Sequence, residues 1–250
     1  TMTMFNKDQI FQLLESRDGE ALRALWRGRG AVDIAALLDS VEDSARQAAV
    51  FRTLPKDLAA DVFSYLPGPT QARLARSFAD GELQQIFDAL HLDDAADFLE
   101  ELPANLVTRI LRSASPQRRM AVNALLRYPA DSAGSVMTPE FVSLRPGDTV
   151  RQALDTIRRT GIHKETVYTC YVLEHRQLLG AVSAKDLLTA AEDTAVADLM
   201  ATDVVSVGTL TDREEAARLL AKYDLLALPV LDGEERMVGI LTVDDAMDVL

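Results

Sequence analysis

The chain has 250 residues, of which 39 are acidic and 26 basic, and 48% of them are hydrophobic. This length and hydrophobic content suit one large or two ordinary globular domains, and the net charge of −13 makes nucleic acids and anionic lipid surfaces poor partners. The single cysteine, Cys170, excludes an intrachain disulfide framework and favours a reducing, cytoplasmic setting.

The two ends of the chain carry little targeting information. The first four residues are neither basic nor apolar enough for a signal peptide, and no apolar run approaches the roughly 18 residues of a membrane span. We therefore expect the chain as given to be soluble. Because it stops inside a helical pattern at Asp248-Val249-Leu250, we also expect the natural protein to be longer.

The first 130 residues have a helical pattern, with apolar residues at spacings of three and four and few β-branched runs. Ser115-Pro116 predicts a helix start, with a capping serine followed by a proline at the first helical position. The segment Ala59–Pro67 recurs as Ala95–Pro103, 36 residues later. A period of this length indicates stacked helical pairs. We predict an all-α, right-handed superhelical domain that presents a surface to a partner.

Two acidic clusters are unbalanced by bases. Residues 79–102 contain eight acidic residues and no Lys or Arg, and residues 186–250 contain fifteen acidic and four basic residues. A charge run is usually a solvated face. Because the two clusters fall in different parts of the chain, however, they also indicate attraction for cations.

From about residue 131 short β-rich runs alternate with helical runs, and a second repeat begins. Each copy predicts strand, helix, strand, turn, strand and helix. The matching pairs are Met137 with Met200, Ala153–Thr160 with Ala216–Tyr223, Tyr171–Glu174 with Pro229–Asp232, and Gly180–Asp186 with Gly239–Asp245. This order resembles a tandem pair of CBS domains. The predicted class is therefore α+β multidomain, with the helical domain at 1–130 and CBS domains at 131–198 and 199–250.

CBS pairs often bind adenine nucleotides in the clefts between their sheets, with the Asp of a [Ser/Thr]-x-x-Asp motif on the ribose. The resemblance makes Asp186 the candidate ribose ligand and places Lys185 near a phosphate. Ser183-x-x-Asp186 and Thr242-x-x-Asp245 are equally acceptable as helix capping motifs. The second cleft is the poorer candidate, because Asp244 and Asp245 would meet the phosphates.

The whole chain is similar to the cytosolic region of MgtE-type magnesium transporters and channels. The resemblance is carried by the acidic helical domain with Leu-Pro repeats, which runs through residues 128–140 into the CBS pair. It implies regulatory Mg²⁺ where the helical domain meets the CBS pair and within the CBS domains. The residues at matching places are Asp61, Asp93, Asp97, Asp212, Ala221 (through its backbone carbonyl), Asp224, Asp245 and Asp248.

The spacing of these residues supports several of them independently. Asp93 and Asp97 are four apart and Asp245 and Asp248 three apart, so each pair shares a helix face. Asp61 departs from the family pattern, because a longer glutamate can occur there. Ser135 stands where the family often has a second glycine.

We therefore expect a Mg²⁺-sensing regulatory module. Mg²⁺ is expected to bind between the helical domain and the CBS pair and to close the module, and this closure is expected to close a pore. Mg²⁺ is the expected cofactor and ATP a candidate one. The expected partners are a second copy, in a homodimer through residues 132–250, and the transmembrane pore domain of the same polypeptide, at the cytoplasmic face of the cell membrane. The alternatives are an adenine-nucleotide-responsive CBS module of another transporter or enzyme, and a scaffold like the flagellar motor switch protein G.

No nucleotide-loop, nucleophile or metalloprotease motif is present in the sequence, so we do not expect an enzyme. His91, His163 and His175 lack metal-ligand spacing, and we expect them at the surface or in an interface. Cys170 and Trp26 stand in apolar surroundings and are expected in the core.

Overall fold

The computed structural model describes residues 7–16 and 18–249, with the side chains of residues 57 and 248 left aside. It forms two compact units, one of residues up to 90 together with 94–120, the other of residues 91–93 together with those from 121 onward. Among the described residues, no helix has both the length and the apolar character needed to cross a membrane.

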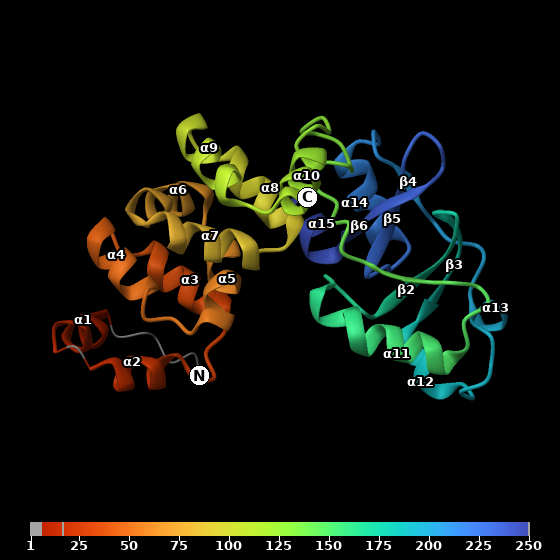
Figure 1. The fold of residues 1–250 in the computed structure, drawn as a ribbon, viewed down its shortest axis with the longest axis horizontal. Coiled ribbons are helices and arrows are strands. Elements are labelled where there is room, and N and C mark those ends of the chain that lie inside the picture. The colour runs from red at the N-terminus through yellow and green to blue at the C-terminus, as the bar shows by residue number, and fades with distance from the viewer. Residues whose placement is uncertain (1–6, 17, 250) are drawn as a thin grey trace. The chain divides into compact units, whose positions relative to one another are not determined.

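The elements up to residue 125 are helices throughout the described chain, as the sequence predicts (Figure 1). They are α1 (Lys7–Glu15), α2 (Gly19–Trp26), α3 (Ala31–Asp39), α4 (Ser44–Phe51), α5 (Lys56–Ser64), α6 (Gly68–Ser77), α7 (Asp80–Ala89), α8 (Leu92–Glu100), α9 (Ala104–Ser113) and α10 (Pro116–Leu125).

Prolines set several helix starts. Pro55, Pro67 and Pro103 occupy the N-cap positions of α5, α6 and α9. The predicted start at Ser115-Pro116 is confirmed, because the Arg118 backbone N–H donates to Ser115 Oγ at 3.2 Å. At Pro116, the first residue of α10, the proline ring fixes a backbone angle that suits the first helical turn and removes an N–H that would have no partner there.

The internal repeat corresponds to α5 and α8, which bury equivalent faces. Phe63 of α5 and Phe98 of α8 are fully buried and meet edge to face, with ring centroids 4.9 Å apart. Such a pair contributes about 0.5–1.5 kcal/mol beyond the burial of its area. Trp26 is buried as expected, and its indole N–H donates to Thr53 Oγ1 at 3.0 Å.

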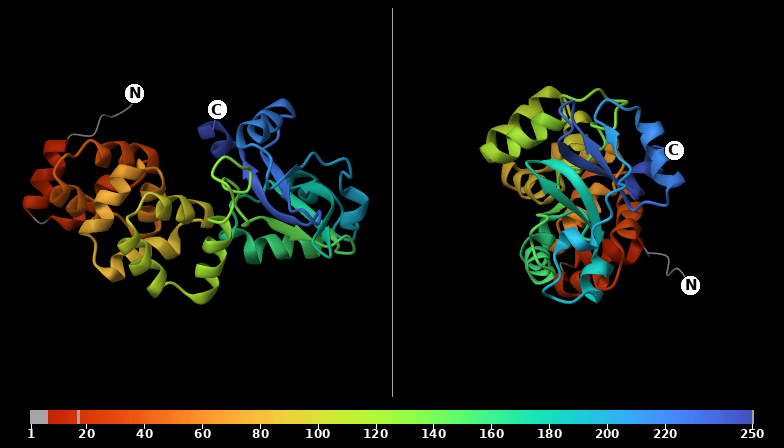
Figure 2. Two further views of the ribbon diagram at one scale, coloured as in Figure 1. Left: turned by 90° about the horizontal axis from the view of Figure 1, so that it is seen from above. Right: turned by 90° about the vertical axis from the view of Figure 1, so that its right-hand side faces the viewer.

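The second unit contains two three-stranded sheets of the same topology, which Figure 2 shows from two further sides. In each, the first strand is parallel to the second and the second antiparallel to the third. The first copy comprises β1 (Val142–Leu144), α11 (Val150–Thr160), η1 (Gly161–His163), β2 (Thr169–Glu174), β3 (Gln177–Ser183) and α12 (Ala184–Thr189). The second comprises α13 (Val196–Leu199), β4 (Val207–Gly208), α14 (Arg213–Lys222), β5 (Ala227–Leu231), β6 (Met237–Thr242) and α15 (Val243–Val249). This is the β-α-β-β-α order that the repeat predicts.

The segment that precedes the first strand of each copy pairs with the third strand of the other copy. Thr138, which precedes β1, pairs with Ile240 on β6, and Ala201, which precedes β4, pairs with Ala181 on β3. A glycine permits each approach. A Cβ at Gly239 would lie 2.9 Å from the Thr138 carbonyl oxygen, and one at Gly180 would lie 2.7 Å from that of Ala201.

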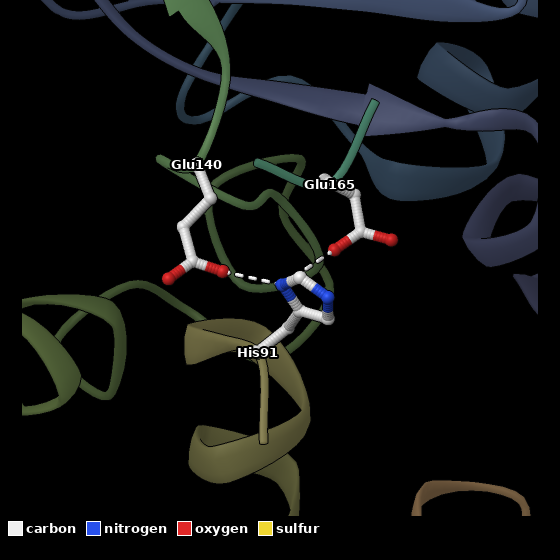
Figure 3. A group of neighbouring side chains, drawn as sticks. All are labelled: His91, Glu140 and Glu165. Atoms are coloured by element: carbon white, nitrogen blue, oxygen red, sulfur yellow. Dashed lines mark hydrogen bonds and ion pairs between the residues drawn. The ribbon is translucent and has the colours of Figure 1, made fainter. Parts of the chain in front are cut away.

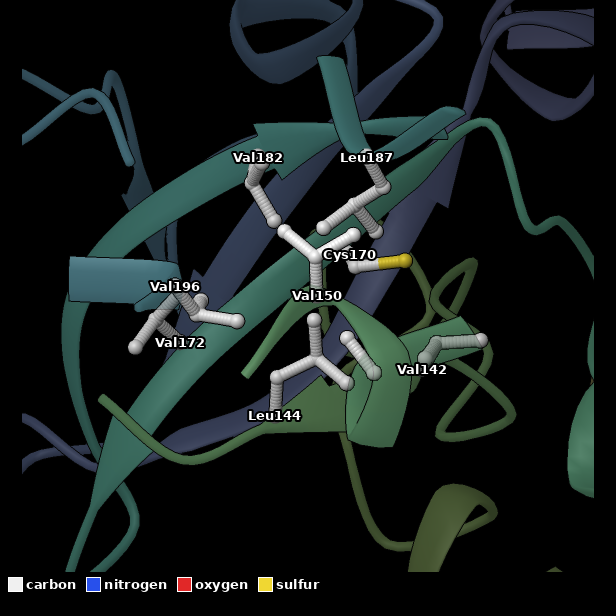
Figure 4. Close-up of a cluster of buried hydrophobic side chains, with 9 residues drawn as sticks. Val142, Leu144, Val150, Cys170, Val172, Val182, Leu187 and Val196 are labelled. Carbon is white, nitrogen blue, oxygen red and sulfur yellow. The ribbon is translucent and has the colours of Figure 1, made fainter. Parts of the chain in front are cut away.

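The first sheet has a core of small and β-branched side chains, shown in Figure 4. Cys170 lies within it, fully buried as predicted, and burial raises the pKa of its thiol to about 12. The other members are Val142, Leu144, Val150, Ala153, Val172, Val182, Leu187 and Val196.

Candidate cation and nucleotide sites

Two glutamates and one histidine converge in the second unit (Figure 3). His91 stands just before α8, Glu140 just before β1, and Glu165 in the segment that leads into β2. His91 Nδ1 lies 2.6 Å from Glu140 Oε2 and 3.1 Å from Glu165 Oε2. The contact with Glu140 is a hydrogen bond. That with Glu165 is an ion pair by distance only, and Glu165 Oε2 is a buried atom without a hydrogen-bond partner among the described residues.

Backbone contacts hold the two glutamates together. The Glu165 N–H donates to the Glu140 carbonyl at 2.8 Å, so the two residues are clamped side by side. The Glu140 N–H donates to Thr138 Oγ1 at 3.4 Å, and Thr138 is tied to β6 by backbone hydrogen bonds in both directions with Ile240. The carboxylates are thus positioned by the exchange of segments between the two copies.

Two aspartates that the sequence predicts as Mg²⁺ ligands lie beside this cluster. Asp93 is buried near the start of α8, and Asp245 stands in the first turn of α15. Burial, followed by the charge of Asp93, raises the pKa of Asp245 to about 8, against the opposing hydrogen bond from Thr242. Asp244 and Glu165 raise it further. The structure therefore brings Asp93 and Asp245 together among carboxylates that repel one another.

The same repulsion acts on Glu165. Burial is the largest cause and the charge of Asp93 the next, and together they raise its pKa to about 7, although His91 opposes the shift. The hydrogen bond that His91 donates to Glu140 raises the pKa of His91 to about 9, with the charges of Glu165, Glu140 and Asp93 adding to it. A cation is therefore favoured here, and the His91 imidazolium is one that the chain itself supplies.

The helix α14 separates three other predicted ligands. Asp212 caps its N-terminus and accepts hydrogen bonds from the Glu214 and Glu215 N–H groups at 3.0 and 3.1 Å. Ala221 and Asp224 lie at its C-terminus, where Asp224 takes a left-handed φ of 51° and its N–H donates to the Ala221 carbonyl. Ten helical residues span about 15 Å. One ion can therefore contact Ala221 and Asp224 together, but not Asp212 of the same chain.

The remaining predicted ligands are not part of this carboxylate cluster as the structure describes it. Asp61 on α5 and Asp97 on α8 are both exposed and belong to the first unit. Asp248 lies in α15, but its side chain is outside the described part of the structure. Asp93 and Asp97 share a helix as expected, yet one is buried and the other exposed.

The predicted nucleotide ligands occupy the first turn of α12. Ser183 is the N-cap residue: its Oγ accepts from the Asp186 N–H at 3.1 Å and donates to Asp186 Oδ2 at 2.6 Å. The capping interpretation is thus confirmed, while Lys185 and Asp186 remain exposed. Tyr168 lies next to this turn, because its carbonyl accepts from the Ala184 N–H, and its side chain is 67% exposed.

The three histidines differ in their surroundings. His163 and His175 are exposed, whereas His91 is half-buried against two glutamates. Its partners stand far away in the sequence, so no spacing pattern could have identified them. The only local signal was the position of Glu140 directly after the Met-Thr-Pro start of the first CBS copy.

Comparison with known proteins places both parts of the chain. Residues 30–131 match the MgtE intracellular N domain, and residues 133–193 and 196–250 each match the CBS domain. The magnesium transporter MgtE of Thermus thermophilus is 41% identical over 244 residues, which are 96% of this chain and 54% of the relative. That of Bacillus subtilis is 38% identical over 184 residues, 73% of this chain and 38% of the relative. The chain thus spans about half the length, or less, of these curated relatives.

Solved structures agree with the fold. The cytosolic domain of the Mg²⁺ channel MgtE in complex with ATP superposes with a TM-score of 0.90 at 40% identity, covering 96% of this chain and 98% of that one. The soluble part of a magnesium transporter gives a TM-score of 0.90 at 27% identity, covering 97% and 95%. The predicted class, a helical domain followed by a CBS pair, is confirmed.

Proposed function

The chain belongs to the MgtE family of magnesium transporters and corresponds to its cytosolic region, and from this premise we propose that it senses Mg²⁺ and regulates a pore. The observation that carries the proposal is the cluster of aspartates Asp93, Asp244 and Asp245 in the second unit, which lie beside Glu165. Mg²⁺ is a hard ion that takes oxygen ligands and keeps part of its water shell. A group of facing carboxylates can therefore bind it without a complete protein cage.

Mg²⁺ closes the helical domain onto the CBS pair in this proposal. Two unit charges about 4 Å apart repel by about 1 kcal/mol in water and by about 4 kcal/mol near a protein surface. Without metal, Asp93 and Asp97 on α8 and Asp245 and Asp248 on α15 favour an open arrangement. Mg²⁺ removes the repulsion and shifts the population by its higher affinity for the closed form. Several weak sites acting together give a steep response.

Limited proteolysis across a Mg²⁺ titration tests this mechanism. We expect residues 129–135, where the N-domain match gives way to the first CBS match, to become protected as Mg²⁺ rises to about 20 mM, well above the roughly millimolar Kd of weak oxygen-ligand sites. We also expect the radius of gyration from small-angle scattering to fall. NaCl at matched ionic strength is the control, because it only screens the charges. An unchanged radius of gyration together with unchanged cleavage would rule out closure.

A second ligand, an adenine nucleotide, fits the first CBS motif. Asp186 and Lys185 are exposed at the N-terminus of α12, and Tyr168 offers an exposed ring beside them. A carboxylate can accept from ribose hydroxyls, and an ammonium can attract a phosphate. The similar cytosolic domain of MgtE was solved in complex with ATP. Calorimetry with ATP, with and without Mg²⁺, also separates this proposal from the alternative of a module that responds to nucleotide alone.

The partners follow from the same proposal. A non-catalytic module of this kind sits at the cytoplasmic face of the membrane, joined to the transmembrane pore of its own polypeptide, and forms a homodimer through residues 132–250. Asp212 and Ala221-Asp224 occupy opposite ends of α14, so a two-fold axis is one way to bring them to a shared ion. Light scattering that gives a monomer mass with and without Mg²⁺ would contradict the dimer.

A further inference from the structure

The geometry around His91 points to a second kind of metal site. We infer that His91, Glu140 and Glu165 bind a first-row transition-metal dication of the Zn²⁺ class, separately from the Mg²⁺ that the aspartates are proposed to bind. The three donor atoms lie within 4.8 Å of one another and belong to one compact unit. This inference goes beyond Mg²⁺ sensing and does not depend on it.

The types of donor atom indicate which class of metal ion the site would bind. Zn²⁺ accepts imidazole nitrogen and carboxylate oxygen together, whereas Mg²⁺ strongly prefers oxygen. His91 offers Nδ1, the atom towards which both carboxylates reach in Figure 3. Glu140 and Glu165 each offer one oxygen at that nitrogen. One nitrogen, two oxygens and a water would complete the four-coordinate shell that is usual for Zn²⁺.

The distances are compatible with that shell. Zn²⁺ lies about 2.0–2.2 Å from nitrogen and carboxylate ligands, so tetrahedral donors are about 3.4 Å apart. The observed separations from Nδ1 are 2.6 Å to Glu140 Oε2 and 3.1 Å to Glu165 Oε2. The two contacts at Nδ1 therefore need to lengthen by less than about 1 Å to admit an ion.

One buried atom supplies an independent reason. Glu165 Oε2 has no hydrogen-bond partner among the described residues, although it is buried and lies 3.1 Å from the ring nitrogen. Burying a polar oxygen in this way is costly unless a partner is supplied. A metal ion at Nδ1 would contact this oxygen directly, whereas a proton on Nδ1 serves Glu140 alone.

The frame around the site is already assembled. The backbone hydrogen bond from Glu165 to Glu140 fixes the two carboxylates side by side, and Thr138 anchors Glu140 to the second sheet. Little side-chain order has to be gained when metal binds. The proton on Nδ1 must leave, however, because a metal ligand must be a neutral imidazole. Proton release on binding, and tighter binding as pH rises, are therefore signatures of this site.

The competing interpretation is that the imidazolium itself is the only cation of the cluster. In that case the chain has a hydrogen-bonded ion-pair network and no metal site. The two interpretations predict opposite results when Zn²⁺ is offered, because only a metal site makes Zn²⁺ affinity depend on His91.

Zn²⁺ affinity, measured by competition with a chromophoric chelator in about 10 mM Mg²⁺, tests the inference, since Mg²⁺ occupies oxygen-only sites. We expect one Zn²⁺ per chain and at least a tenfold loss of affinity in His91→Gln and in Glu140→Gln. His91→Gln is the sharpest variant, because its amide can still donate to Glu140 while offering a poor metal ligand. His163→Ala and Glu174→Gln, both at exposed positions, are the matched controls and should bind as the native chain does.

Co²⁺ provides a direct view of the ligands, because its visible absorption reports coordination number and nitrogen ligation. We expect a visible band that is lost in His91→Gln and kept in His163→Ala. Equal Zn²⁺ affinity of the native chain and His91→Gln would overturn the inference, as would an imidazole that stays protonated by NMR at saturating Zn²⁺. The Mg²⁺-dependent protection of residues 129–135 should persist in His91→Gln, so either proposal can fail alone.

Discussion

The two CBS copies place the same capping motif in different electrostatic surroundings. Ser183 and Asp186 begin α12 in the first copy, and Thr242 and Asp245 begin α15 in the second, each with the hydroxyl hydrogen-bonded to the carboxylate. Asp186 is exposed, whereas Asp245 is half-buried beside Asp93, Asp244 and Glu165. A motif match therefore predicts the local turn, while the neighbouring side chains determine the exposure and the charge environment of its aspartate.

The largest expected effect is the loss of the Mg²⁺ response when the aspartate of the second motif is neutralised. Asp245→Asn keeps the shape of the side chain but cannot lose a proton to become an anionic Mg²⁺ ligand, so the midpoint of Mg²⁺-dependent protection at residues 129–135 should rise at least tenfold. The matching change in the first copy, Asp186→Asn, should leave the midpoint unchanged. Protease mapping of both variants checks this prediction. Equal Mg²⁺ midpoints for the two variants would contradict the proposed difference between the copies.

Nucleotide binding should show the reverse pattern. Asp186→Ala removes the carboxylate that is proposed to accept from the ribose, and hydrogen bonds to charged groups contribute about 1.5–3 kcal/mol. ATP affinity measured by calorimetry should therefore fall by about tenfold to a hundredfold. Asp245→Ala is the control and should bind ATP as the native chain does. A loss of equal size in both variants would indicate a shared structural effect instead.

Substituting the glycine in the third strand should lower the stability of the fold by a similar amount in both copies. This result would separate effects on folding from effects on ligand binding. Gly180→Ala and Gly239→Ala each force a Cβ to within 3 Å of a backbone carbonyl of the other copy's leading segment. Overpacking of this kind costs about 1–3 kcal/mol, and for a chain of this size about 1 kcal/mol lowers Tm by about 2–4 °C. Gly233→Ala, where no atom lies within 4 Å, is the control for thermal melting.

The sequence predicts much of this fold because its signals are local. Proline and serine caps, the α5–α8 repeat and the two β-α-β-β-α copies depend on neighbours within a few residues, and the structure confirms them. The apolar neighbours of Cys170 and Trp26 also predict that both residues lie in the core, and both are buried. None of these features requires knowledge of which distant segments meet.

The candidate site was predicted only in part, for the opposite reason. Asp93 and Asp245 could be inferred from the family resemblance, and the structure brings them together. Glu140 and Glu165 meet because a backbone hydrogen bond joins their segments, and the His91 side chain contacts both. A single sequence contains no spacing that reveals such a meeting. The exposure of Asp186 against the burial of Asp245 is likewise a tertiary property of two nearly identical motifs.

The smallest expected effect is a pH dependence of stability that follows from the buried second motif. Asp245 has its pKa raised from 3.8 to about 8, so between these values the native state keeps a proton that the unfolded chain has lost. His91, whose pKa is raised from 6.5 to about 9, likewise keeps a proton in the native state that the unfolded chain loses between these pH values. Because the native state binds more protons in this window, the free energy of unfolding falls as pH rises.

Metal-free chain should therefore melt at a lower temperature at about pH 9 than at about pH 5, by at least the few degrees that about 1 kcal/mol represents. Asp245→Asn should flatten this slope, because the amide cannot ionise, and Asp186→Asn should not. Mg²⁺ should raise Tm more at the higher pH, where the cluster carries more charge for it to neutralise. If native chain and Asp245→Asn melt in parallel across this range, Asp245 titrates as an ordinary carboxyl, and the two motifs differ in exposure but not in charge.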